Sequence, residues 1–180
     1  MFEKLIANIA LALRQNHIPY IIIGGQAVLK YGIPRLTQDI DITLGIGVEK
    51  FFKLRKIIKS LHFSILVPDP EKFVKETMVL PVKDRDTGIR IDFIFSFSMY
   101  EKQAISRGVA VNINNVEVKF ASLEDLIIHK IIAGRPRDIE DVKSILTINP
   151  DFDRLYIENW LEKFDESLFE NYMKTFQDLI

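Results

Sequence analysis

The segment Asp39-Ile40-Asp41-Ile42 alternates acidic and aliphatic residues, and this alternation strongly constrains the fold. Successive side chains of a β-strand point to opposite faces, so the two aspartates share a face and lie about 7 Å apart along the strand. Ile40, Ile42 and Leu44 lie on the other face and supply its contact with a core. The segment therefore predicts a strand that is half core and half acidic site, suited to hard divalent cations such as Mg²⁺.

A glycine pair, Gly24-Gly25, follows the apolar run 20–23 and precedes a helical stretch at 26–31. Glycine permits a sharp turn and a close approach of a ligand to the backbone. The free N–H groups and the dipole at the start of a helix favour an anion. This turn is predicted to hold a triphosphate whose metal ions bind the two aspartates.

Together, the glycine pair and the Asp-Ile-Asp segment resemble the signature of the nucleotidyltransferase superfamily that includes DNA polymerase β. That signature is a hydrophobic residue, Gly-Gly or Gly-Ser, a spacer, and two acidic residues separated by a hydrophobic one. The resemblance implies a third carboxylate on a neighbouring strand downstream. Residues 89–95 fit this requirement, because alternation places Asp92 with Arg90 on the face opposite the apolar side chains. Taken alone, that face is more typical of a solvated edge strand, but the presence of Asp39 and Asp41 favours a triad with Asp92.

A narrower resemblance covers residues 31–39 and 125–141, within a match that extends over about residues 20 to 145. These segments resemble bacterial and archaeal nucleotidyltransferases related to the toxin of type IV abortive-infection systems. The matching positions in the second segment are Lys130, Ala133, Arg135, Arg137, Asp138 and Asp141. The resemblance implies that this segment helps form the nucleotide cleft. Arg35 and Thr37 also match, and loop structure alone is the alternative explanation of these two residues. Full toxins are longer, so their acceptor specificity does not transfer.

We therefore expect an α+β protein with the nucleotidyltransferase fold, a mixed sheet flanked by helices. The expected domain spans residues 1–147, and a C-terminal helical appendage spans 148–180. The expected reaction moves a nucleoside monophosphate from an NTP to an acceptor hydroxyl and releases pyrophosphate. The catalytic and metal-binding residues are Asp39, Asp41 and Asp92, with two Mg²⁺ ions, or Mn²⁺ in their place. The nucleotide-binding residues are Gly24, Gly25, Lys130, Arg135 and Arg137.

Three readings of the function remain open at this point. The first is a toxin-like enzyme that modifies tRNA or a protein and is inhibited by an antitoxin partner. The second is a non-catalytic nucleotide-binding module. The third is a small-molecule nucleotidyltransferase of the antibiotic-resistance type. A neighbouring antitoxin reading frame favours the first, nucleotide binding without turnover the second, and a deep acidic acceptor pocket the third.

The pattern of apolar residues predicts strands alternating with helices, followed by helices alone. Predicted strands lie at 20–23, 39–44, 63–66, 78–82, 89–95, 109–113 and 116–120. Predicted helices lie at 2–16, 26–31 and 48–60, then after Ser122 and from Pro136, and finally as a hairpin at 152–164 and 167–179. The turns at 84–88 and Asn114-Asn115 predict two β-hairpins.

Composition excludes several other classes of protein. Lys and Arg total 24 against 25 for Asp and Glu, so nucleic acid would have to be bound by a local cluster. The basic residues between 53 and 59 are best explained as the solvated face of a helix, whereas those near 135–143 border the predicted site. No apolar run approaches a membrane span of about 18 residues, and no signal peptide is evident, which predicts a cytoplasmic protein. The absence of cysteine excludes thiol chemistry.

Overall fold

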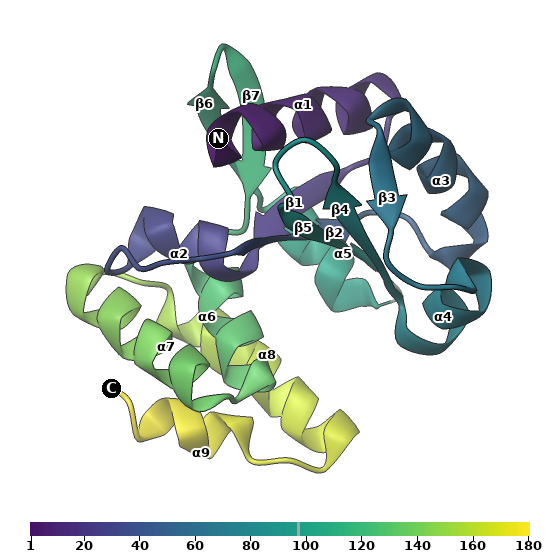
Figure 1. Cartoon of the computed structure of the whole chain (residues 1–180). Helices are drawn as coiled ribbons and strands as arrows, with labels where there is room; N and C mark the ends of the chain where they lie inside the picture. Colours follow the sequence, from purple (N-terminus) through teal and green to yellow (C-terminus); the bar gives the residue numbers. More distant parts are fainter. Residues whose placement is uncertain (97) are drawn as a thin grey trace. The chain divides into compact units, whose positions relative to one another are not determined.

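The computed structural model describes residues 1–96 and 98–180 (Figure 1). The chain forms two compact units, each made of two segments. Unit 1 comprises residues 1–26 and 37–121, and unit 2 comprises residues 27–36 and 122–180. The chain passes between them within α2 (Gly24–Tyr31), at Leu36-Thr37 and at Ala121-Ser122. The predicted division after residue 147 falls inside unit 2 and stays a prediction.

Unit 1 is built on a mixed seven-stranded sheet with the order β3-β4-β5-β2-β1-β7-β6. The strands are β1 (Tyr20–Ile23), β2 (Asp39–Leu44), β3 (Phe63–Ile65), β4 (Val79–Asp84), β5 (Arg90–Phe95), β6 (Val109–Ile113) and β7 (Val116–Phe120). β2 runs parallel to β5, and β1 runs parallel to β7, while the other neighbouring pairs are antiparallel. Asn114 and Asn115 both have positive φ in the β6–β7 turn, as a two-residue hairpin requires.

The core of unit 1 lies on one face of the sheet. Ile40 and Ile42 of β2 are fully buried beside Ile91 and Phe93 of β5, their partners in register. Helices cover the sheet along its length (Figure 1): α1 (Phe2–Gln15) contacts β7 and β6, α3 (Phe51–Ser60) contacts β3, α4 (Pro70–Thr77) contacts β4, and α5 (Met99–Ser106) contacts β1 and β2. A 3₁₀ turn, η1 (Val48–Lys50), precedes α3. The predicted half-core, half-polar strand is therefore observed in β2.

Unit 2 is helical. It contains α6 (Leu123–Ala133), α7 (Pro136–Ile148), α8 (Arg154–Leu168) and α9 (Tyr172–Gln177), with α6 contacting each of the others. Ser122 caps α6 by accepting a hydrogen bond from the Asp125 backbone, and Gly134 ends that helix in a left-handed conformation. Pro136 begins α7, where its missing N–H costs nothing. The predicted C-terminal hairpin corresponds to α8 and α9.

These observations confirm the predicted α+β class with a mixed sheet flanked by helices. Two helices were not predicted, α4 and α5, each eight residues long. Within residues 1–96 and 98–180, no helix combines the length and the apolar character that crossing a bilayer requires.

Candidate active site

Two parallel strands bring the predicted acidic residues together in unit 1. Asp41 of β2 is the register partner of Asp92 of β5, so their backbones are about 4.8 Å apart. Asp39 is the register partner of Arg90, two residues along the same face. All three aspartates are half-buried, whereas the alternate residues Ile40 and Ile91 are fully buried. The shared face predicted for the three carboxylates is therefore present.

Arg90 is the positively charged residue that lies next to these carboxylates. Its Nε donates to Asp92 Oδ1 at 2.9 Å, and the arginine side chain is 55% exposed. The hydrogen bond to Asp92 is the main cause that raises the pKa of Arg90, and the negative charges of Asp92, Asp39 and Asp41 raise it further. The face therefore concentrates negative charge at one place and attracts cations there.

Gly24 packs directly against this acidic face at the end of β1. Its φ is +63°, and a Cβ at this position would lie 1.9 Å from Asp41 Oδ2. Any other residue would be strained in the backbone and would also displace the carboxylate. Ile23 of β1 is the register partner of Asp41, which fixes this approach. Gly24 is thus needed both for the turn and for the position of Asp41.

Gln26 is a candidate site residue that the sequence analysis did not identify. It directly follows Gly25 in the first turn of α2 and is only 7% exposed. Its Nε2 has no hydrogen-bond partner among the described residues. A buried amide without a partner costs about 1–3 kcal/mol, so it is usually satisfied by something, such as a ligand. The only sequence feature that points to Gln26 is its position directly after the glycine pair.

The acidic face can be tested as a metal site by its donors. Carboxylate oxygens are the ligands that Mg²⁺ prefers. In the described part of the chain, however, no three Asp, Glu, His or Cys side chains are arranged closely enough to hold a metal ion. Asp92 is instead bound to Arg90. The donor chemistry therefore fits a divalent cation, and a cation bound at Asp92 would compete with Arg90 for that carboxylate.

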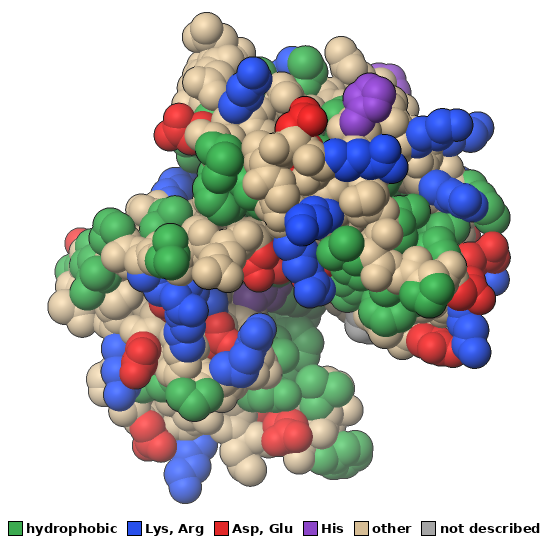
Figure 2. All heavy atoms as spheres, viewed as in Figure 1, with side chains coloured by type: hydrophobic (Ala, Val, Ile, Leu, Met, Phe, Trp, Pro, Cys, Tyr) green, Lys and Arg blue, Asp and Glu red, His purple; other side chains and the backbone are tan. Residues whose placement is uncertain are grey.

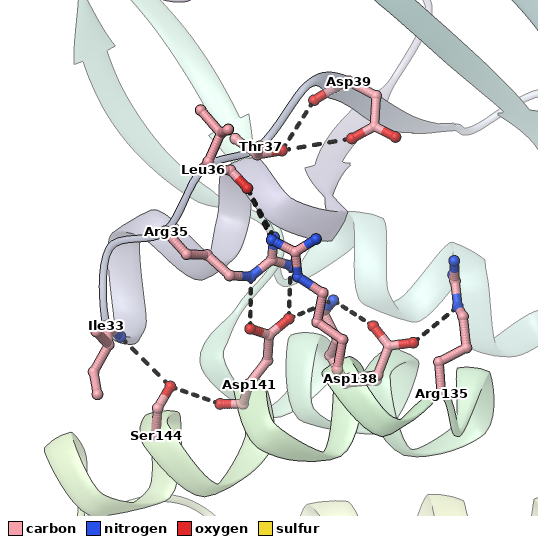
Figure 3. Close-up of polar contacts among 11 residues, drawn as sticks. Ile33, Arg35, Leu36, Thr37, Asp39, Arg135, Asp138, Asp141 and Ser144 are labelled. Atoms are coloured by element: carbon pink, nitrogen blue, oxygen red, sulfur yellow. Dashed lines mark hydrogen bonds and ion pairs between the residues drawn. The ribbon is translucent and has the colours of Figure 1, made fainter.

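The predicted basic residues lie in unit 2, around a buried ion-pair network that joins α6, α7 and the loop after α2 (Figure 3). Lys130 Nζ lies 2.6 Å from Asp138 Oδ1 and 2.9 Å from Asp141 Oδ2. Arg35 binds the two oxygens of Asp141 at 2.7 and 2.8 Å. The side chains of Lys130, Asp138 and Asp141 are at most 8% exposed. The matched motif residues thus hold unit 2 together.

Arg135 and Arg137 lie at the edge of this network. Arg135 Nε is 3.0 Å from Asp138 Oδ2, but its side chain is 79% exposed. Arg137 donates to the carbonyl oxygen of Leu36 at 2.9 Å. The contact between Arg135 and Asp138 is an exposed ion pair, so it contributes little stability. Such surface pairing is the alternative to a phosphate-binding role for Arg135.

Burial and ion pairing act in opposite directions on Asp141. Burial raises the pKa of its carboxyl group, but hydrogen bonds from Arg35 and Lys130, together with their charges, lower that pKa below its ordinary value of 3.8. Asp141 is therefore held as a carboxylate between two cations. Such a buried pair is costly to break, because removal of one partner leaves a charge without compensation.

Comparisons with known proteins bear on the family and the fold of this chain. A family model described as "Nucleotidyltransferase of unknown function (DUF6036)" matches residues 1–163. No curated protein sequence matches this chain significantly. Solved structures with a similar fold include the antibiotic-resistance factor ANT(2'')-Ia in solution, with a TM-score of 0.63 and 16% identity over 92% of each chain.

Two other structures extend this comparison. A crystal structure of ANT(2'')-Ia in complex with adenylyl-2''-tobramycin has a TM-score of 0.63 and 17% identity, and the match covers 92% of this chain and 98% of that one. An antigenic nucleotidyltransferase-like protein from Paracoccidioides brasiliensis has a TM-score of 0.60 and 17% identity, over 96% of this chain and 92% of that one. At such low identities these likenesses establish the fold, and the predicted nucleotidyltransferase fold is confirmed.

Proposed function

We propose that this chain, which belongs to the nucleotidyltransferase family DUF6036, transfers a nucleoside monophosphate from an NTP to an acceptor hydroxyl in a metal-dependent reaction that releases pyrophosphate. The observation that carries the proposal is the acidic face of the sheet, with Asp41 opposite Asp92 on parallel strands and Asp39 on the same face. Gly24 supports it because the missing side chain of this glycine leaves the space that the Asp41 carboxylate occupies at the end of β1.

Asp39, Asp41 and Asp92 are the proposed ligands of two Mg²⁺ ions, for which Mn²⁺ can substitute. Bound Mg²⁺ supplies positive charge that offsets the triphosphate and the charge developing on the attacking and leaving oxygens. Asp92 is the proposed acceptor of the proton from the acceptor hydroxyl. Arg90, whose Nε donates to Asp92 Oδ1, would share this carboxylate with the cations or release it to them.

The start of α2 is the proposed cradle for the phosphates. Gly24 and Gly25 provide backbone N–H groups at a helix N-terminus, which favours anions. Gln26 adds a buried amide nitrogen that needs an acceptor. These features lie on the segment that follows β1, and Asp41 is the register partner of the last residue of that strand.

Lys130, Arg135 and Arg137 are proposed as further phosphate ligands. The support is their match to the motif and their charge, and for Arg135 also its exposure of 79%. Lys130 has to exchange an aspartate for a phosphate oxygen to act in this way, because both Asp138 and Asp141 lie within 3 Å of its ammonium. Its ion-pair role is the competing explanation.

The acceptor is the open part of the proposal. A toxin-like enzyme acting on tRNA or a protein, with an antitoxin partner, is supported by the motif in residues 125–141. A small-molecule acceptor is supported by the similarity of the fold to ANT(2'')-Ia over 92% of this chain. The two differ in where a transferred nucleotide ends up.

The test is to incubate the protein with each labelled NTP, Mg²⁺, total RNA, total protein and a mixture of metabolites and aminoglycosides. We expect label from one NTP to appear in one of these fractions together with pyrophosphate, and to disappear with the Asp41→Asn variant. Label in RNA or protein favours the toxin-like acceptor, and label in an aminoglycoside favours the antibiotic type. NTP binding with no transfer to any acceptor would show a non-catalytic module and overturn the proposal.

A further inference from the structure

A basic groove lies along α3 and the edge strand β3 in unit 1. It is a cleft of about 610 Å³. We call it the α3 groove and define it by six of its lining residues: Phe52, Arg55, Lys56, Lys59, Phe63 and Arg85. Figure 2 shows Lys and Arg side chains gathered on the surface over α3. Arg85 comes from the β4–β5 turn, so the positive charge of the groove has two separate structural sources.

The cations of this groove are exposed and not neutralised. Arg55, Lys56, Lys59 and Arg85 are all exposed, and within residues 1–96 and 98–180 none of them has an ion-pair partner. No acidic residue lines the groove in the described chain. Arg55 and Lys59 are four residues apart on one helix, a spacing at which like charges destabilise the helix by a few tenths of a kcal/mol. A folding role alone does not explain this arrangement.

Two other basic residues of the protein illustrate the contrast, because each has an acidic partner. Lys130 lies between two aspartates in unit 2. A second cleft in unit 1, of about 420 Å³, contains Lys119, which pairs with Glu117 at 3.4 Å. The α3 groove is therefore suited to an anion supplied from outside the chain.

The groove also contains an exposed aromatic ring. Phe52 is 55% exposed, while the adjacent Phe51 is only 3% exposed and holds it edge-on at a centroid distance of 5.3 Å. An exposed ring beside several cations is what single-stranded nucleic acids need, because bases stack on aromatic faces while phosphates bind Lys and Arg. An acidic peptide would use the cations without using the ring.

From this combination we propose that the α3 groove binds an unpaired polynucleotide strand, with a base against Phe52 and phosphates against Arg55, Lys56, Lys59 and Arg85. β3 and β5 are separated by β4 alone in the sheet, so β3 lies about 10 Å across the strands from β5, and the Asp92 side chain points to the face of the sheet opposite Phe63. A strand bound in the groove needs only a few nucleotides to extend that far. Binding itself depends on the charge and shape of the groove and not on nucleotidyl transfer.

The test measures the affinity of the whole protein, without NTP or divalent cations, for a fluorescein-labelled oligouridine about ten nucleotides long, by fluorescence anisotropy. Four phosphate contacts predict a slope of about −3 for the logarithm of affinity against the logarithm of salt concentration. Phe52→Ala should weaken binding about tenfold through loss of stacking. Lys59→Gln should weaken it several-fold and reduce the slope by about 0.7.

Lys53→Gln is the matched control. Lys53 is exposed on α3, like Lys59, but it does not line the groove. Its loss should change affinity by less than about twofold, because only distant, screened attraction is removed. Thermal melts of all variants check that they remain folded, which is expected for exposed positions. Equal effects of Lys53→Gln and Lys59→Gln would overturn the proposal, because they would indicate general attraction to a basic helix.

Competitors separate the proposed ligand from other anions. If oligothymidine competes as well as oligouridine, the groove binds unpaired DNA and RNA alike. If oligothymidine competes more weakly, the proposed ligand is RNA. Polyglutamate, duplex or free UMP that displaces the probe as effectively as the unlabelled strand overturns the proposal. The transfer reaction is measured separately with Asp41→Asn, which lies outside the groove. If the protein binds the oligonucleotide but transfers no nucleotide, the proposed transferase function fails and the α3 groove proposal stands. If it transfers nucleotide but does not bind the oligonucleotide, the α3 groove proposal alone is overturned.

Discussion

The two units each bring aspartates and cations together, but the balance of charge and the exposure differ. In unit 2, Asp138 and Asp141 are buried among Lys130, Arg35 and Arg135. In unit 1, three half-buried aspartates surround one cation, Arg90, and raise its pKa, and the side chain of Arg90 is 55% exposed. The unit 2 cluster is a structural device, because each of its charges has a partner of opposite sign within the fold. In a half-exposed acidic cluster, a bound metal ion can instead replace the side-chain cation, as the proposed metal site needs.

The largest expected effect tests the structural role of the unit 2 cluster. Lys130→Met removes the cation shared by two buried carboxylates, so we expect the free energy of unfolding to fall by about 3–5 kcal/mol. Urea unfolding measures this change. Lys75→Met removes an exposed cation that pairs with Glu71 and should cost less than about 1 kcal/mol.

Nucleotide affinity is measured on the same Lys130→Met protein, at a temperature where it is folded. A small loss of stability together with a large loss of NTP affinity would reverse the comparison, and Lys130 would belong to the binding site.

The next effect tests the acidic face of unit 1. Asp41→Asn keeps the shape of the side chain but removes one of three neighbouring negative charges. Transfer should fall more than about 100-fold, because a metal ligand is lost, and the stabilisation by Mg²⁺ plus NTP should largely vanish. The melting temperature of the ligand-free protein should stay the same or rise, because repulsion between carboxylates decreases.

Thermal melts with and without Mg²⁺ and each NTP measure these shifts. Asp86→Asn, in the exposed β4–β5 turn, is the matched control and should behave like the native protein. If Asp41→Asn markedly lowers the stability of the ligand-free protein and leaves the ligand-induced shift intact, Asp41 is a structural residue and the metal site is wrong.

Arg90 gives a sharper test of cation exchange. Arg90→Gln frees Asp92 and removes one positive charge from the acidic face, so Mn²⁺ should bind about tenfold more tightly by electrostatics alone. Mn²⁺ binding followed by electron paramagnetic resonance measures this without any turnover. Lys83→Gln is the control, since Lys83 is the exposed register partner of Arg90 on β4 and has no contact with Asp92 recorded among the described residues. Equal affinities for native protein and Arg90→Gln would mean that Arg90 and the metal do not compete.

The main parts of the fold were predictable from local patterns. β2, β6 and β7 have the predicted bounds because two-residue alternation or a hairpin turn delimits them. The two missed helices, α4 and α5, are short, but their caps were present in the sequence. Asp69-Pro70 begins α4, and Ser98 with Glu101 forms a capping box at α5.

The arrangement of the candidate site was predictable where its residues belong to regular strands or to the glycine turn that follows β1. Alternation placed Asp39, Asp41 and Asp92 on one face, but no local rule predicts that Arg35 binds Asp141, 106 residues away. The motif around Lys130 suggested phosphate binding, whereas the structure pairs that lysine with aspartates on the following helix. The partner of a charged side chain depends on tertiary packing, which periodicity does not specify.

Acid denaturation separates the two clusters further. The folded pKa of Asp141 is lower than its ordinary value of 3.8, so its contribution to stability is complete above pH 3.8 and is lost as the pH falls through the folded pKa. We expect the difference in unfolding free energy between native protein and Asp141→Asn to be largest near neutral pH and to shrink below pH 3.8. Urea unfolding at several pH values measures it. A difference independent of pH would show that the ion pairs of Asp141 are not responsible.

The smallest expected effect concerns Gln26, the polar group that unit 1 leaves without a partner. Gln26→Leu replaces a buried amide whose Nε2 has no hydrogen-bond partner in the described chain, so the ligand-free protein should gain about 1 kcal/mol of stability. If that amide instead serves a bound triphosphate, the stabilisation produced by saturating NTP should decrease in the same variant. Gln103→Leu, at an exposed position of α5, should change neither quantity by more than about 0.5 kcal/mol. A gain in stability with an unchanged response to NTP would make Gln26 a packing defect, and a loss of stability would mean that its amide is already satisfied. Only the combination of higher intrinsic stability and a weaker response to NTP would show that the buried amide of Gln26 is kept for a ligand.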